Sequence, residues 1–137
     1  MYEHGSYQCE TKGEVIICSL NGAFNETGIT SCLNAQKQAI KSFGSRRCFL
    51  LVDCTELTGA TPEAYKTVDD FYRDLNYPQL VAIAIIHTQY VLARLEERDI
   101  PQMKNHNIQV FANRKSALSW FEEAEINIPQ ESLIYQP

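Results

Sequence analysis

Two threonine hydroxyls in the middle of the chain are well placed for chemistry. Thr58 and Thr61 lie in a polar segment from Asp53 to Glu63, which follows a buried apolar stretch and leads into a helix start. A helix N-terminus presents unpaired N–H groups that favour an anion, so a phosphoryl group on either hydroxyl would be stabilised there. The plainer alternative is that Thr61 only caps the helix and that Thr58 and Gly59 form a turn.

A nucleophilic pair is the other chemistry that the residue types allow. Cys54 and His87 both stand near the ends of expected strands, and a thiol beside an imidazole can act as a nucleophile. The sequence shows no group that would orient such a pair, so we expect no catalytic residue. It also contains no phosphate-binding GxxxxGK(S/T) or GxGxxG motif and no GxSxG nucleophile elbow.

The five cysteines are expected to be reduced and structural. Their number is odd, no CxxC spacing occurs, and the three histidines lie far from them in the sequence. Neither a closed disulfide framework nor a zinc site is indicated, and we expect neither a metal nor another cofactor. Free cysteines of this kind usually behave as small buried hydrophobic residues.

Composition and charge narrow the class of protein. The chain has 137 residues, 45% of them hydrophobic, and a formal net charge of −5, which predicts one globular domain, placed at residues 1–125. The acidic balance argues against a nucleic-acid partner. The longest strictly apolar run, 80–86, is far shorter than the ~20 residues of a membrane-spanning helix, and no leader precedes it, so we expect a cytoplasmic protein.

Hydrophobic periodicity predicts an α/β fold. The expected strands are 5–11, 14–20, 48–52, 80–86 and 108–111, and the expected helices are 29–43, 62–75, 88–99 and one capped by Asn113. Asn21 and Gly22 are expected to break the chain, and 54–60 to form a polar loop. Strands that alternate with helices imply a mostly parallel sheet of about five strands with about four helices, the first strand an antiparallel edge.

The last residues, 126–137, have no clear period but are rich in apolar side chains. A free tail would not expose so many of them, so we expect this segment to pack on the domain or across a homodimer.

Short stretches along nearly the whole chain resemble the STAS domain, and within it the SpoIIAA-like group. They are Leu20–Phe24, Phe49–Asp53, Gly59–Ala64, Val110–Asn113 and Ala117–Trp120. The resemblance implies a SpoIIAA-like fold and a non-enzymatic module that binds a protein in bacterial signalling, as the anti-sigma-factor antagonists do. The partner that it implies is a kinase or another anti-sigma-type regulator.

The resemblance also directs attention to a phosphorylation site. In the sporulation antagonists an Asp-Ser-Ser-Gly motif at the start of the helix after the third strand carries a regulatory phosphoserine. This chain has no such motif, and the serine position falls near Pro62 or Glu63. A nearby threonine could take the phosphate, the charge of Glu63 could replace it, or the scaffold could have another use. The candidate partner-binding or phosphoacceptor residues are Asp53, Thr55, Thr58, Thr61 and Glu63.

A second function follows from the similarity of this group to lipid-carrier domains of the Sec14 type. The chain would then carry or sense a small apolar ligand. The candidate pocket residues are Tyr65, Phe71, Tyr72, Tyr90, Val91 and Leu95, which ordinary core packing also explains. An apolar pocket between the sheet and the second or third helix would favour the carrier, and a filled core would exclude it.

Overall fold

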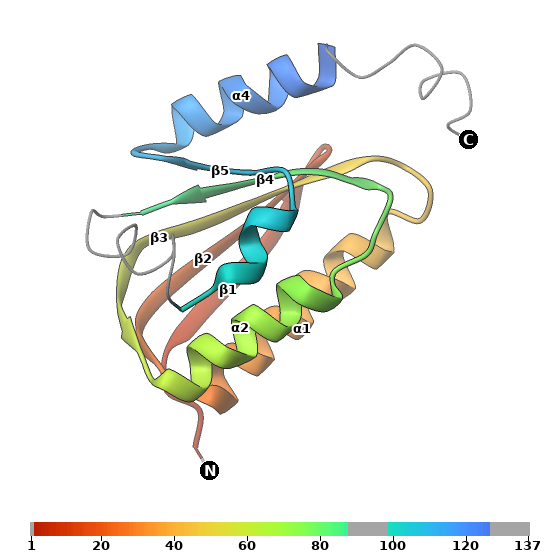
Figure 1. Cartoon of the computed structure of the whole chain (residues 1–137). Coiled ribbons are helices and arrows are strands. Elements are labelled where there is room, and N and C mark those ends of the chain that lie inside the picture. Colours follow the sequence, from red (N-terminus) through yellow and green to blue (C-terminus); the bar gives the residue numbers. More distant parts are fainter. Residues whose placement is uncertain (1, 88–98, 127–137) are drawn as a thin grey trace.

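A computed structural model describes residues 2–87 and 99–126 of the chain, and it confirms the expected α/β architecture (Figure 1). The strands are β1 (Ser6–Lys12), β2 (Val15–Phe24), β3 (Cys48–Ala60), β4 (Leu80–Ile86) and β5 (Ile108–Phe111). The helices are α1 (Glu26–Ser42), α2 (Pro62–Asp74), the 3-10 helix η1 (Pro101–Asn105) and α4 (Arg114–Ile126).

The strands form one sheet in the order β1-β2-β3-β4-β5. β1 pairs antiparallel with β2, and each of the other neighbouring pairs is parallel. The first strand is therefore an antiparallel edge, as the sequence predicts. Gly13 allows the tight turn between β1 and β2 because its φ of 61° lies in the left-handed region.

Helices cover both faces of the sheet. α1, α2 and η1 lie against one face, and α4 lies against the other (Figure 1). Side chains of β3 alternate between the two: Leu50 and Val52 belong to the core under α1 and α2, whereas Phe49 and Leu51 belong to the core under α4. The rings of Phe49 and Phe121 pack with their centroids 4.9 Å apart. Both faces of the parallel strands are thus buried, as their continuous apolar runs predict.

The described residues contain three α-helices rather than the expected four. The helix that accounts for the difference was expected over 88–99. Residues 88–98, which include the pocket candidates Tyr90, Val91 and Leu95, lie outside the described part of the chain. The same holds for 127–137, which make up nearly all of the expected packing tail. The short helix η1 was not expected. Within the described ranges, no helix is both long and apolar enough to cross a membrane.

Two expectations about irregular segments are wrong. Asn21 and Gly22 continue β2, and 54–60 continues β3, because these two segments pair with each other. The register runs from Asn21 opposite Glu56 to Phe24 opposite Ala60. Main-chain hydrogen bonds make this ladder, so the polar side chains that indicated a loop do not prevent it. Gly22 adopts a φ of 88° where the ladder is irregular.

Side-chain caps begin the helices. The Oδ1 atom of Asn25 accepts hydrogen bonds from the backbone N–H groups of Gly28, at 2.8 Å, and His4, at 3.1 Å. Its Nδ2 donates to the carbonyl oxygen of Tyr2 at 2.8 Å. Asn25 is 8% exposed. One buried amide therefore starts α1 and fixes the N-terminal segment against it.

We expect Gly28→Ala to destabilise the fold, although alanine normally favours a helix. A Cβ atom at position 28 would overlap the carbonyl oxygen of His4, and overpacking of this kind costs about 1–3 kcal/mol. Urea unfolding measures the loss. In a chain that lacks residues 1–4 the clash is gone, so the same substitution should be neutral or stabilising. Equal destabilisation in both chains would show that His4 is not the cause.

Candidate functional site

The carboxyl ends of β2 and β3 lead directly into α1 and α2, so both helices start at the same edge of the sheet (Figure 1). The backbone N–H of Thr61 donates to the carbonyl oxygen of Phe24 at 3.0 Å and extends the β2–β3 pairing to the start of α2. Functional loops of open α/β sheets lie at this edge. The candidate residues from Asp53 to Glu63 lie along the last part of β3 and at the start of α2, close to this edge.

Thr58 occupies an irregular position in the β2–β3 ladder. The register passes from Gly22 opposite Leu57 to Ala23 opposite Gly59, so Thr58 is an extra residue with no partner on β2. An extra residue in a strand forms a β-bulge, and bulges commonly re-aim a side chain beside a functional site. The expected turn at Thr58 and Gly59 is therefore wrong, since both residues belong to a bulged strand.

The three candidate hydroxyls differ in their hydrogen bonds. Thr55 donates its hydroxyl hydrogen to Asp53 Oδ1 at 2.8 Å. Thr61 Oγ1 accepts from the backbone N–H of Ala64 at 3.1 Å, which confirms it as the cap of α2. Thr58 is exposed, and its hydroxyl makes no hydrogen bond to any described residue. Of the three, Thr58 has the hydroxyl that is free to react.

Asp53 is buried and fully occupied by contacts within the chain. Its Oδ1 accepts from the backbone N–H of Thr55 at 3.0 Å, and its Oδ2 accepts from Arg114 Nε at 2.8 Å. Arg114 also donates to Ser19 Oγ at 3.1 Å. Burial alone would raise the pKa of Asp53, but the hydrogen bonds from Thr55 and Arg114 outweigh it and hold the pKa below its usual range. The carboxylate thus ties the start of α4 to β3.

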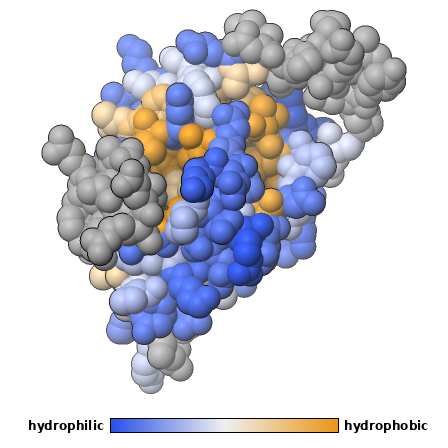
Figure 2. All heavy atoms as spheres, in the orientation of Figure 1, coloured by the Kyte–Doolittle hydropathy of each residue, from blue (hydrophilic) through white to orange (hydrophobic). Residues whose placement is uncertain are grey.

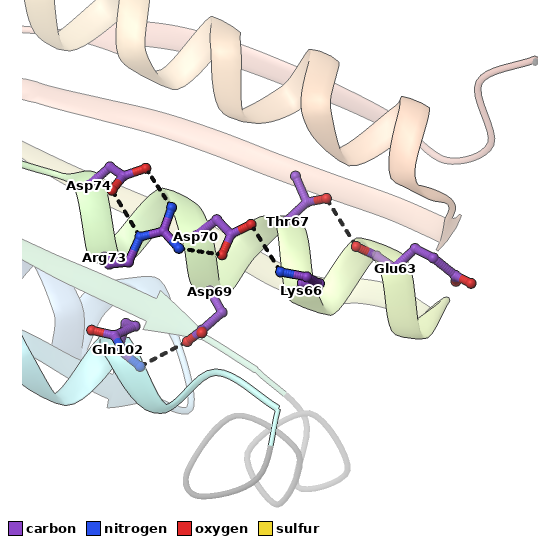
Figure 3. Close-up of polar contacts among 8 residues, drawn as sticks. All are labelled: Glu63, Lys66, Thr67, Asp69, Asp70, Arg73, Asp74 and Gln102. Carbon is purple, nitrogen blue, oxygen red and sulfur yellow. Dashed lines mark hydrogen bonds and ion pairs between the residues drawn. The ribbon is translucent and has the colours of Figure 1, made fainter.

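The outer face of α2 carries a chain of ion pairs (Figure 3). Arg73 contacts Asp74 through Nε and Nη2, both at 3.0 Å, and Asp70 through Nη1, also at 3.0 Å. Lys66 Nζ lies 3.5 Å from the other oxygen of Asp70. Glu63 is exposed in the first turn of the same helix. Asp69 differs, because it turns toward η1 and accepts from the backbone N–H of Gln102 at 2.9 Å.

A groove of about 250 Å³ lies between α1 and α2. Its wall on α1 includes Asn34 and Lys37, and its wall on α2 includes Thr67, Asp70 and Phe71. Phe71 therefore lines this groove and also packs in the core beneath α1 and α2. In the view of Figure 2 the surface over α2, in the lower part of the molecule, is mainly hydrophilic. Hydrophobic residues lie above it, beside η1 and beneath α4.

A second, apolar cavity of about 70 Å³ lies between the sheet and the helices α1, α2 and η1. Tyr65 and Tyr72, two of the pocket candidates, line it. Gln36 of α1 also lines it and is 2% exposed. Gln36 was not among the site residues that the sequence predicts. Its place in the apolar stripe of α1 is the signal that could have found it.

The five cysteines are free thiols, as expected. Burial, with smaller effects of Asp53 and Cys18, raises the pKa of Cys54 to about 12. The contact with Cys32, at 3.6 Å between the two sulfur atoms, and burial raise the pKa of Cys18 to about 12. These thiols are protonated near neutral pH, which makes them poor nucleophiles. In the described ranges, no three or more His, Cys, Asp or Glu side chains converge as metal ligands.

We expect Asp53→Asn to reduce stability by about 1–2 kcal/mol at pH 7, since it removes a buried charged acceptor whose donor, Arg114, is partly exposed to solvent. The lowered pKa of Asp53 means that the carboxylate stabilises the fold above about pH 4 and that this contribution is lost as pH falls through the folded value. Urea unfolding between pH 7 and pH 3 should show the difference from wild type shrink.

The control for this prediction is Glu10→Gln, which changes a more exposed carboxylate on β1. It should shift stability by less than about 0.5 kcal/mol at any pH. A loss in Asp53→Asn that is the same from pH 7 to pH 3 would contradict the assignment.

Comparisons with known proteins place the fold. No family model matches the sequence, and a comparison with curated proteins found no match. Several solved structures are similar to the chain. An uncharacterised protein of the DUF3478 family with a SpoIIAA-like fold, from Shewanella loihica PV-4, matches with a TM-score of 0.60 and 16% identity over 88% of this chain and 95% of that one.

Two of the similar structures are regulatory proteins. The anti-sigma factor antagonist SpoIIAA in its unphosphorylated form has a TM-score of 0.60 and 11% identity over 85% of this chain and 98% of its own. An anti-sigma factor antagonist from Mycobacterium paratuberculosis has a TM-score of 0.62 and 11% identity over 85% of this chain and 93% of its own. This protein therefore has the SpoIIAA-like fold that its sequence resemblance predicts.

Proposed function

We propose that this chain is a non-enzymatic regulatory module that binds a protein partner in bacterial signalling. The partner-binding surface consists of the outer face of α2 and the groove between α1 and α2, together called the α2 surface. Its residues are Asn34, Lys37, Glu63, Lys66, Thr67, Asp70, Arg73 and Asp74. The observation that carries the proposal is this unfilled groove of about 250 Å³ beside a continuous charged helix face.

The charges of the α2 surface suit recognition of a protein. Acidic and basic groups alternate along α2, from Lys66 through Asp70 and Arg73 to Asp74. Such a pattern requires a partner with charges in complementary positions, and charge complementarity steers association and excludes wrong partners. The groove beside it offers room for a side chain of the partner between α1 and α2.

The fold supports a regulatory role. Two of the similar structures are anti-sigma factor antagonists, so a kinase or anti-sigma-type regulator in the bacterial cytoplasm is the class of partner that we propose. A fold does not determine function by itself. The proposal therefore rests also on a local feature of this chain, the charges and the groove of the α2 surface.

We propose Thr58 as the phosphoacceptor of the module. Its hydroxyl is exposed, whereas those of Thr55 and Thr61 are engaged within the chain. Thr58 lies in a bulge three residues before the cap of α2. A phosphate would add about −1.5 to −2 charges to an acidic chain and weaken the binding of a partner that complements the unmodified surface.

We expect phosphorylation to occur at Thr58. Intact-mass analysis and peptide mapping of the protein from its own source should find one phosphate there, because its hydroxyl is the free one. Thr58→Ala should abolish it, whereas Thr11→Ala, which changes an exposed threonine on β1, should not. A phosphate on Thr61, or none under any growth condition, would overturn this assignment but not the α2 surface.

We expect partner binding to be lost when the groove is filled. Asn34→Arg combined with Thr67→Arg places two long side chains in the groove without removing an ion pair of α2. Recovery of the wild-type partner in affinity purification with quantitative mass spectrometry should fall at least about tenfold, which corresponds to 1.4 kcal/mol.

The matched control adds the same charge at the far edge of the sheet, as Gln8→Arg combined with Thr11→Arg on β1. This variant should recover the partner as the wild type does. If both variants have the melting temperature of the wild type and the groove variant still recovers the same partner in equal amounts, the proposal is wrong.

A further inference from the structure

The cavity between the sheet and the helices is apolar over most of its wall. β2, β3 and β4 contribute side chains such as Leu20, Val52 and Ile85, and α2 and η1 contribute Val68 and Met103. Most of the apolar side chains beneath α1 and α2 pack against one another in a single core cluster, so a space of about 70 Å³ is a local exception to close packing. It is large enough for several waters or a very small organic molecule.

Gln36 brings an unpaired polar atom to this apolar wall. Its side chain is 2% exposed, and its Nε2 lies 3.4 Å from Cys18 Sγ and 3.7 Å from Cys32 Sγ. Its Oε1 has no hydrogen-bond partner in the described part of the chain. A buried carbonyl oxygen without a donor is costly and rare in folded proteins, so each instance calls for an explanation.

Tyr72 marks the same region of the cavity. It is 4% exposed, and its pKa is raised first by burial and then by the nearby thiols of Cys54, Cys32 and Cys18. Cys18 and Cys32 are the two thiols that Gln36 contacts. The Tyr72 hydroxyl makes no hydrogen bond to another residue in 2–87 or 99–126. Gln36 and Tyr72 thus bring polar groups to the part of the cavity near these two thiols, and most of its wall is apolar.

We propose that this cavity binds a small aliphatic alcohol or the hydroxyl end of a larger one. The ligand hydroxyl donates to Gln36 Oε1, and its hydrocarbon part lies against the apolar walls. An apolar cavity of about 150 Å³ holds benzene, which has six heavy atoms. By the same ratio a cavity of about 70 Å³ accommodates roughly three heavy atoms, which is enough for the hydroxyl end of a longer alcohol such as 1-butanol. The site lies beneath α2, separate from the α2 surface, and does not depend on the partner-binding proposal.

The hydroxyl is the feature that the geometry selects. An ether of the same composition has the same apolar size and an oxygen atom, but it has no hydrogen to donate to Oε1. A site built for a hydroxyl rejects an analogue that leaves its buried polar group unpaired. Two isomers, 1-butanol and methyl propyl ether, therefore separate hydrogen bonding at Gln36 from simple filling of an apolar space.

The test is a titration of the isotope-labelled full chain with each isomer, followed by amide chemical shifts in NMR. We expect 1-butanol to give saturable shifts at cavity residues such as Leu33, Val68 and Met103, with at least about fivefold tighter binding than the ether. Gln36→Met should abolish this preference and raise the melting temperature by about 2–5 °C, because it removes an unpaired polar group from the core.

Gln38→Met is the matched control, since it makes the same change at an exposed position of α1. It should retain the preference for 1-butanol. The proposal is overturned if neither isomer gives saturable shifts, as expected of a cavity that holds only water, or if the ether binds as tightly as the alcohol. Retention of the preference in Gln36→Met would also overturn it. Each of these results leaves the groove-filling experiment on the α2 surface unaffected.

Discussion

The pairing of β2 with β3 beyond Asp53 is the constraint on which the rest of the molecule depends. It carries the two strands to a common edge, where Phe24 accepts a hydrogen bond from the backbone of Thr61. Because α1 and α2 start directly from these strand ends, their relative position follows from the ladder. The groove between them, the cavity beneath them and the bulge at Thr58 all result from this one extended parallel pair.

Two buried polar side chains of the core illustrate opposite outcomes of burial. Asp53, on the face covered by α4, has donors for both oxygens, and its charge stabilises the junction of β3 with α4. Gln36 lies on the face covered by α1 and α2. Its Nε2 donates only to sulfur atoms, which are weak acceptors, and its Oε1 has no hydrogen-bond donor among the described residues. The first arrangement strengthens the fold, whereas the second weakens it and leaves a polar group available in an apolar space.

Periodicity predicted the elements whose side chains are buried in a regular pattern. β4 and β5 have the bounds that the sequence analysis expected, and the caps Thr61 and Asn113 start α2 and α4. The extension of β3 was missed because main-chain bonds to β2 form it, and side-chain pattern carries no signal of them. The exposed hydroxyl of Thr58 could be named from the sequence, but its bulge depends on a register between distant segments. The ion pair of Asp53 with Arg114 joins residues 61 positions apart and has no local signal either.

The contacts of Asn25 with the backbone of Tyr2 and His4 have a practical consequence for anyone who handles the protein. They hold the N-terminal segment beside the starts of α1 and α2 (Figure 1). A purification tag or fluorescent fusion attached there would emerge from a fixed point next to the helices of the α2 surface and would compete sterically with the proposed partner. A label attached through an exposed position of β1, at the edge of the sheet opposite β5, would avoid the starts of α1 and α2.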